Sequence, residues 1–183
     1  EQFGLNRPVF LDREALAQGD FRRFIDTQYF RYMGRILVLD LGTSIHRRIP
    51  VAATLAERFP ATVELALLAM LIATTIGVPV GIISAARRGS LLDGATMIGS
   101  LVGVSMPIFW LGLMLIMFFG VELNWLPIGG RLTTGVEVKT ITKLVLVDSL
   151  ITGNLTAFRD AFEHIIMPAV ALATIPMAII ARM

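Results

Sequence analysis

The chain has 183 residues, of which 55% are hydrophobic and 16% are charged, and its mean hydropathy is +0.74. This composition lies outside the range of soluble globular domains and is typical of a membrane protein. The net charge of +2 and the absence of cysteine argue against nucleic-acid binding, a disulfide framework and thiolate sites. We predict an all-α membrane protein, truncated at both ends, because no methionine starts the chain and an apolar run ends it.

Residues 1–59 are polar, with acidic and basic side chains in near balance, which suits a segment exposed to water. Five apolar residues recur there at helical spacing: Ile25, Tyr29, Met33, Ile36 and Leu37. This spacing predicts a short amphipathic helix. Such a helix either lies on the membrane surface or packs against the rest of the fold, and we favour packing.

The next two apolar stretches are each long enough to cross a membrane, which takes about 20 residues. We predict transmembrane helices at about 62–86 and 95–120, joined by a short polar turn at 87–94. The backbone groups of this turn could not be satisfied in lipid, so the turn must lie at a membrane face. Pro79 and Pro107 lie inside the two spans, where each removes a backbone donor and favours a bend.

Polar residues return at 121–163, where glycines and one apolar run too short to span predict a loop with one or two short helices. Trp125 ends the second span at the depth where aromatic belts lie. A third apolar segment at 165–181 then predicts a helix at about 164–183, shortened by the end of the chain.

The distribution of arginines predicts which face of the membrane each segment occupies. Arg87 and Arg88 lie in the shortest loop, and Arg182 lies at the matching end of the third segment. Basic residues in short loops mark the cytoplasmic side, whereas long segments cross regardless of charge. The basic residues at the opposite face all belong to long segments: Arg47, Arg48, Arg58 and Arg131. We therefore expect an extracytoplasmic segment at 1–59 and a transmembrane domain at 60–183 with an extracytoplasmic loop at 121–163.

Glu64 is the only ionisable residue well inside an apolar run, and an intramembrane acid is a functional-site hypothesis by default. It lies only two residues into the predicted span, where it can reach interfacial water or Arg58 on the preceding turn. We favour an interfacial or helix-start role and keep contact with a substrate or partner as the alternative. A proton relay would need further buried acids, which the spans lack.

Candidates for lining a translocation path lie near the middle of the spans: Thr74, Ser105, Pro107 and Trp110. The alternative for the hydroxyl groups is a hydrogen bond to backbone or to a neighbouring helix, and the alternative for the indole is simple packing. Two small-xxx-small pairs are candidates for close helix packing: Gly77 with Gly81, and Gly99 with Gly103.

Nothing in the sequence predicts catalysis or metal binding. The two histidines, His46 and His164, are far apart and no carboxylates cluster at ligand spacing. Motifs of zinc hydrolases, serine esterases and P-loop nucleotide sites are absent. We therefore expect no catalytic residue, no metal ligand and no cofactor in this chain.

Several stretches carry a resemblance when they are taken in order. They are residues 39–44, 60–66, 77–81, 87–90, 105–112, 125–131, 148–150 and 164–169. Together they resemble the inner-membrane permease subunits of bacterial ABC importers for dipeptides, oligopeptides and nickel, in particular the B-type subunit. The stretch 105–112 is similar to that family's Ser-x-Pro-x-Phe-Trp-x-Gly motif, while Leu39 stands where the family usually has glycine, and the segment 11–27 looks longer than is typical.

The resemblance implies a partial type I ABC importer transmembrane domain, with three of its helices plus extracytoplasmic segments, in the bacterial inner membrane. It implies a permease subunit that forms a path for peptides or similar small solutes by alternating access. The implied partners are a second similar permease, two cytoplasmic ATPase subunits that carry the ATP, an extracytoplasmic solute-binding protein and the lipid bilayer. The alternatives are a secondary transporter, which more often shows an inverted repeat, and a membrane-embedded enzyme.

Overall fold

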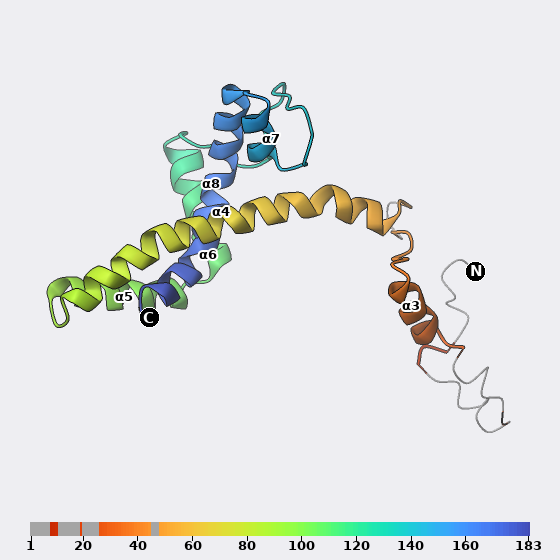
Figure 1. Ribbon diagram of the computed structural model, residues 1–183, viewed down its shortest axis with the longest axis horizontal. Coiled ribbons are helices and arrows are strands. Elements are labelled where there is room, and N and C mark those ends of the chain that lie inside the picture. Colours follow the sequence, from red (N-terminus) through yellow and green to blue (C-terminus); the bar gives the residue numbers. More distant parts are fainter. Residues whose placement is uncertain (1–7, 11–18, 20–25, 45–47) are drawn as a thin grey trace. The chain divides into compact units, whose positions relative to one another are not determined.

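The computed structural model describes residues 8–10, 19, 26–44 and 48–183. In this part of the chain all regular structure is helical apart from one isolated bridge between Thr43 and Pro50, which confirms the predicted all-α class. The chain divides into two compact units, Glu1–Arg58 and Phe59–Met183 (Figure 1).

The first unit contains α3 (Gln28–Leu37), at the place where the apolar spacing predicts a helix. Ile25 lies outside the described residues, whereas Tyr29, Met33 and Leu37 lie on α3 and are exposed. The ring of Tyr29 contacts that of Phe10, with centroids 5.9 Å apart. No residue of α3 is buried, so its apolar face is open within this unit.

The second unit holds the remaining helices. They are α4 (Val51–Ala86), which begins in the first unit, α5 (Leu91–Ser105), α6 (Ile108–Leu115), the π-helix η1 (Ile116–Glu122), α7 (Val145–Ile151) and α8 (Leu155–Ile180). Among the described helices, α4 and α8 are each long and apolar enough to cross a membrane, and α5 with α6–η1 counts as a third span if the bent pair is one span.

Helix α4 begins at Val51, well before the predicted start at residue 62. Pro60 looked like a helix start, because proline is favoured at the first helical position. It lies inside the helix instead, since alanine, leucine, glutamate and arginine on its N-terminal side are strong helix formers. Helix α8 likewise begins at Leu155 rather than near residue 164, with Asn154 as its N-cap accepting from the Ala157 N–H at 3.0 Å.

The predicted span at 95–120 is not one continuous helix, because the chain breaks between α5 and α6 with a bend of 100° next to Pro107, where a bend was expected. Met106 has φ −83° and ψ 125°, and Pro107 has φ −62° and ψ 128°. Proline disfavours the helical region for the residue before it and donates no hydrogen bond, so the two residues together end α5. Pro79 causes no such break, since α4 continues through it.

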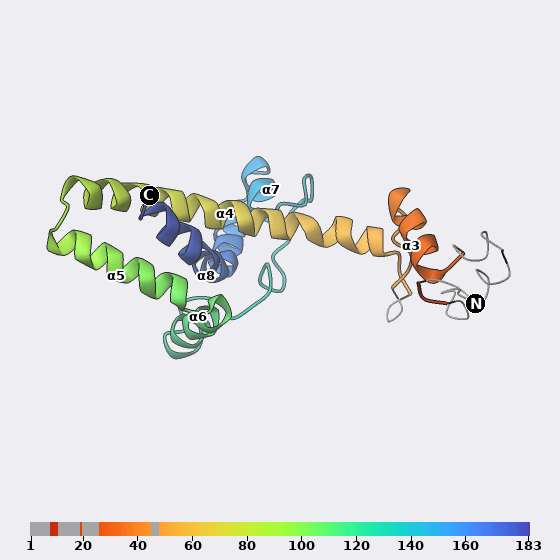
Figure 2. The same ribbon diagram turned by 90° about the horizontal axis from the view of Figure 1, so that it is seen from below.

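Helix α8 is the centre of the second unit and passes between α4 and the α5–α6 pair (Figure 2). Its buried face is made mainly of alanine: Ala157, Ala161, Ala169, Ala171, Ala173 and Ala178. Helix α4 meets this face with small residues of its own, among them Ala69, Ala73 and Gly77. A Cβ placed on Gly77 would lie 3.0 Å from the carbonyl oxygen of Met177. The two backbones therefore approach closely, as small residues in membrane helices allow.

We predict that Gly77→Ala destabilises the protein while Gly99→Ala does not. Both changes remove a helical glycine and gain the same helix propensity, but a Cβ on Gly99 meets nothing within 4 Å, whereas a Cβ on Gly77 meets backbone. The free energy of unfolding of the Gly77 variant should fall by about 1–3 kcal/mol relative to that of the Gly99 variant. Denaturant unfolding of the full-length protein in detergent measures this difference, and equal stability of the two variants would contradict the close approach.

Candidate functional site

Glu64 on α4 is 7% exposed and makes contacts with two distant parts of the chain. Its Oε2 accepts a hydrogen bond from Arg131 Nη2 at 3.0 Å, and its Oε1 accepts one from the Leu146 backbone N–H at 2.6 Å. Leu146 lies in the first turn of α7, whose N-cap Leu144 provides no side-chain hydrogen bond. The carboxylate of Glu64 therefore satisfies a free donor at the N-terminus of α7, where a negative charge is also favourable.

The predicted helix-start role of Glu64 is wrong, because α4 begins at Val51 and Glu64 lies several turns inside it. The basic partner of Glu64 in the described structure is Arg131 rather than Arg58. Arg131 is half-exposed and its Nη2 also lies 3.4 Å from the carbonyl oxygen of Lys143. An interfacial location for Glu64 stays a prediction.

Asp148 on α7 fixes the segment that precedes its own helix. It is 1% exposed and accepts from the backbone N–H groups of Ile141, Thr142 and Lys143 at 3.0, 2.8 and 3.0 Å. The Thr142 hydroxyl donates a fourth hydrogen bond at 2.6 Å. Burial by itself would raise the pKa of Asp148, but these four hydrogen bonds outweigh it and hold the pKa below its usual value.

Asp160 on α8 holds the same loop from a third helix. Its two oxygens accept from the backbone N–H and the hydroxyl of Thr133, at 2.8 and 2.6 Å. Glu64, Asp148 and Asp160 therefore fix the segment 131–146 against α4, α7 and α8. We call these three carboxylates and their donors the carboxylate clasp. The sequence reading missed Asp148, Asp160 and Arg131 as site residues, although all three lie in the predicted loop.

A cavity of about 170 Å³ lies beside the clasp. Its polar lining comes from Glu64, Arg131 and His164, and the rest comes from Ala61, Leu65, Gly130, Val145, Leu146, Ala161, Ile165 and Pro168. His164 is 8% exposed, and its Nδ1 lies 2.8 Å from the Asp160 carbonyl oxygen. Since a carbonyl only accepts, Nδ1 carries a proton. No group of three metal-binding side chains occurs within the described residues.

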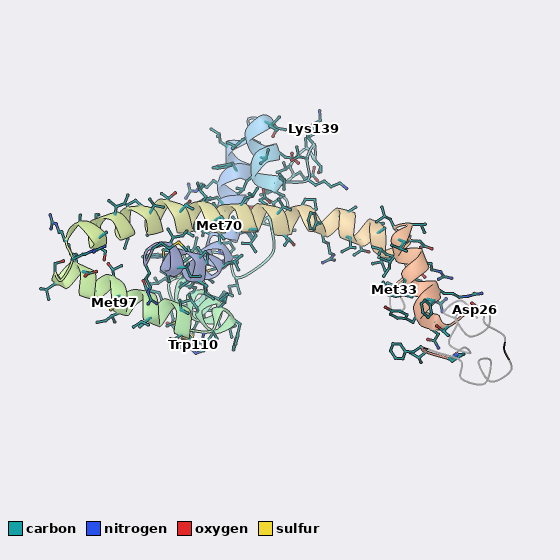
Figure 3. The ribbon with its side chains drawn as sticks, turned by 60° about the horizontal axis from the view of Figure 1, so that its bottom comes forward. Asp26, Met33, Met70, Met97, Trp110 and Lys139 are labelled. Carbon is teal, nitrogen blue, oxygen red and sulfur yellow. The ribbon has the colours of Figure 1, made fainter. Side chains whose placement is uncertain are left out.

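The four path candidates lie elsewhere. Thr74 is exposed on α4, and its hydroxyl donates to the carbonyl oxygens of Met70 and Leu71 at 2.9 and 3.1 Å. Ser105 and Pro107 lie on either side of the 100° break, and both are exposed. Trp110 is 45% exposed and projects from α6 on the side away from α4 (Figure 3).

Three of the four packing glycines lie against α8. In addition to Gly77, a Cβ on Gly81 would lie 3.2 Å from the Ala181 carbonyl oxygen, and one on Gly103 would lie 3.2 Å from Thr174 Cγ2. Gly99 has open space beside it. The four-residue spacing identifies small residues but does not show which of them face a neighbour.

Comparison with known proteins gives a family and several relatives. Residues 77–183 match the family described as binding-protein-dependent transport system inner membrane component. The chain is 45% identical over 170 residues to the di/tripeptide transport system permease protein of Pseudomonas aeruginosa strain UCBPP-PA14, an alignment that covers 93% of this chain and 51% of that protein.

Dipeptide transport system permease proteins of two further bacteria are also similar. That of Escherichia coli K12 is 43% identical over 159 residues, which are 85% of this chain and 47% of the relative. That of Alkalihalophilus pseudofirmus OF4 is 40% identical over 183 residues, which are 100% of this chain and 50% of the relative. The chain thus spans about half the length of the curated relatives it matches.

We predict energetic coupling between Glu64 and Arg131. Arg131→Met leaves a 7% exposed carboxylate without its cation and should cost about 1.5–3 kcal/mol of unfolding free energy. Glu64→Gln combined with Arg131→Met should cost less than the sum of the single changes, by about 0.5–3 kcal/mol. The control is Arg159→Met, which removes an 84% exposed arginine paired with Glu163 and should change stability by less than about 1 kcal/mol. If the double variant lost as much unfolding free energy as the two single variants together, the interaction between Glu64 and Arg131 would contribute nothing to stability.

We also predict that the clasp around Asp148 weakens in acid. The folded-state pKa of Asp148 is lowered, so its contribution is present above the unfolded value of about 3.9 and is lost as pH falls through the folded pKa. The protection factors of the amides of residues 141–143, which compare each amide with its intrinsic exchange rate at the same pH, should fall below about pH 4. In Asp148→Asn, exchange there should already be fast at pH 7, while the loop control Glu137→Gln should match the unchanged protein. Protection that persists in Asp148→Asn would contradict this role.

Proposed function

We propose that this chain, which belongs to the family of binding-protein-dependent transport system inner membrane components, forms part of the membrane path of an ATP-driven bacterial importer for short peptides. Membership of the family confirms the resemblance predicted from the motifs and the location in the bacterial inner membrane. The single observation that supports a peptide as the cargo is the 45% identity, over 93% of this chain, to a di/tripeptide permease.

The break between α5 and α6 supports a path at that level. Non-helical backbone at membrane depth is tolerated only where protein buries it or where it lines a water-filled cavity. Ser105 and Pro107 flank the break and are exposed in this chain. The second permease covers part of this surface, and the transported peptide passes along the remainder, near Thr74 and Trp110.

The chemistry of the chain supports transport without chemical change of the cargo. The buried carboxylate of Glu64 is engaged by a guanidinium and a backbone N–H, and that of Asp148 accepts four hydrogen bonds. Neither is poised as a catalytic base or a proton relay. The family description, a binding-protein-dependent transport system, supports an energy source in partner subunits: two cytoplasmic ATPases bind and hydrolyse ATP, and this shifts the permease pair between inward-facing and outward-facing states.

The carboxylate clasp supports a role for the outer loop as a docking surface. Carboxylates from α4, α7 and α8 hold the segment 131–146 in one arrangement. A surface that is ordered before binding loses less entropy when a partner docks. The clasp thus presents a fixed surface to the extracytoplasmic binding protein that delivers the peptide.

Reconstitution of the full-length protein in liposomes, with its second permease, ATPases and binding protein, tests the proposal. Uptake of a labelled dipeptide should require both ATP and the binding protein, and a non-hydrolysable ATP analogue should abolish it. Uptake driven by a proton or sodium gradient without ATP would instead identify a secondary transporter.

Cysteine substitution tests the position of the path, because the chain contains no cysteine. In the reconstituted importer, Ser105→Cys and Trp110→Cys should lose most of their peptide uptake on treatment with a cationic methanethiosulfonate reagent. The control is Ile76→Cys, at an α4 position that is 47% exposed, that lies on a different face of the helix from Thr74 and that we assign to lipid. Equal inhibition of all three variants, or of none, would contradict a path at the break between α5 and α6.

A further inference from the structure

Three arginines lie at the end of the second unit opposite the clasp. Arg87 and Arg88 lie in the turn between α4 and α5, and Arg182 follows α8 directly. All three are exposed. Within the described residues, no carboxylate lies within ion-pair distance of any of them. Arg88 still interacts electrostatically with the nearby Asp93, but none of the three guanidinium groups is held in an ion pair within the described residues.

Helix packing brings Arg182 to the other two. The Cβ position of Gly81 on α4 lies 3.2 Å from the carbonyl oxygen and 3.3 Å from the Cα of Ala181, the residue before Arg182. Arg87 is six residues beyond Gly81, about 9 Å along a helix axis. Figures 1 and 2 both show the carboxyl terminus beside α4 toward its turn with α5. Long arginine side chains from both elements can therefore reach one common point.

The turn that carries Arg87 and Arg88 is fixed by Asp93. Its Oδ1 accepts from the Ser84 hydroxyl at 2.6 Å, and its Oδ2 accepts from the Gly89 backbone N–H at 2.9 Å. Ser90 caps α5 by accepting from the Asp93 N–H at 3.4 Å, and Gly89 has φ +75°, a conformation that favours glycine. The carboxylate of Asp93 is thus directed into the turn, and the backbone that carries the two arginines is ordered before any ligand binds.

Large exposed apolar side chains lie close in sequence to Arg87 and Arg88. Leu91, next to the turn, is 94% exposed, and Ile82 and Ile83 on the last turns of α4 are 64% and 49% exposed. A basic cluster bordered by exposed apolar side chains matches the boundary between lipid headgroups and acyl chains. This border favours a lipid over a free phosphate ion, which would contact only the arginines.

We infer that Arg87, Arg88 and Arg182 form a binding site for the phosphate group of an anionic phospholipid whose acyl chains pack on Ile82, Ile83 and Leu91. Guanidinium groups bind phosphate oxygens in pairs of parallel hydrogen bonds. Basic residues at a membrane surface are also attracted to anionic lipid. The site requires only that the chain is inserted in a membrane and does not depend on the cargo.

The test is lipid binding by the full-length protein after delipidation, with phosphatidylglycerol as the probe and phosphatidylcholine as the uncharged comparison. Native mass spectrometry should show retention of phosphatidylglycerol in preference to phosphatidylcholine. Arg87→Gln combined with Arg88→Gln should weaken phosphatidylglycerol binding about twenty-five-fold, at about fivefold per arginine. The matched control is Arg58→Gln combined with Arg159→Gln, which removes two exposed arginines elsewhere and should leave binding unchanged.

Unchanged phosphatidylglycerol binding in the double Arg87 and Arg88 variant would overturn the site. Equal loss in the control pair would overturn it as well, because the effect would then follow from net charge alone. If the variant kept its lipid but no longer copurified with the ATPase subunits, the arginines would bind an acidic protein surface and the lipid assignment would be wrong. If free inorganic phosphate bound with the same affinity as phosphatidylglycerol, the acyl chains would contribute nothing to binding and the lipid assignment would be wrong.

Discussion

The arrangement of the second unit depends on the small side chains of α8. Alanines line its buried face, and Gly77 and Gly81 on α4 bring the two backbones within van der Waals contact of each other. In a membrane the hydrophobic effect contributes little to helix association, because lipid is as apolar as the helix surfaces. Close packing of this kind must therefore hold the helices together. A larger side chain on α8 or at these glycines would separate α4 from α8 and with them the groups at both ends of the bundle.

Two charged sites use this packing at opposite ends. At one end, Glu64 on α4 and Asp160 on α8 hold the loop that carries Arg131 and Thr133. At the other end, contact between Gly81 and Ala181 brings Arg182 toward the turn that carries Arg87 and Arg88. Any movement of α4 relative to α8 would therefore displace groups at both sites. At the first site the movement would change the loop on which we propose that the binding protein docks. At the second site it would change the surface on which we propose that lipid binds.

The membrane-spanning helices and the bend at a proline could be predicted from the sequence. Contacts between residues that lie far apart in the chain could not. The spans at α4 and α8 follow from composition, and a bend at Pro107 was expected, although its size was not, because the bend depends on how α5 and α6 each pack on α8. Pro60 was misread because proline at a helix start and proline inside a helix look the same in sequence. Glu64 was singled out correctly as unusual, but Arg131 lies 67 positions away, and no local pattern connects the two. Gly99 shows the same limit, since its spacing from Gly103 indicates a packing face that the structure does not use there.

The central claim is that the bent pair α5 and α6–η1 counts as one crossing, so that the carboxylate clasp lies outside the cell membrane and the arginine turn lies in the cytoplasm. The most direct measurement is labelling of Ser90→Cys and Thr134→Cys in the full-length protein, in intact cells, with a membrane-impermeant thiol reagent. The account predicts that the cysteine at 134 reacts at once and that the cysteine at 90 reacts only after the membrane is permeabilised. If both positions were labelled from the same side, the bent pair would re-enter the face from which it came, and the clasp and the arginines would share one side of the membrane.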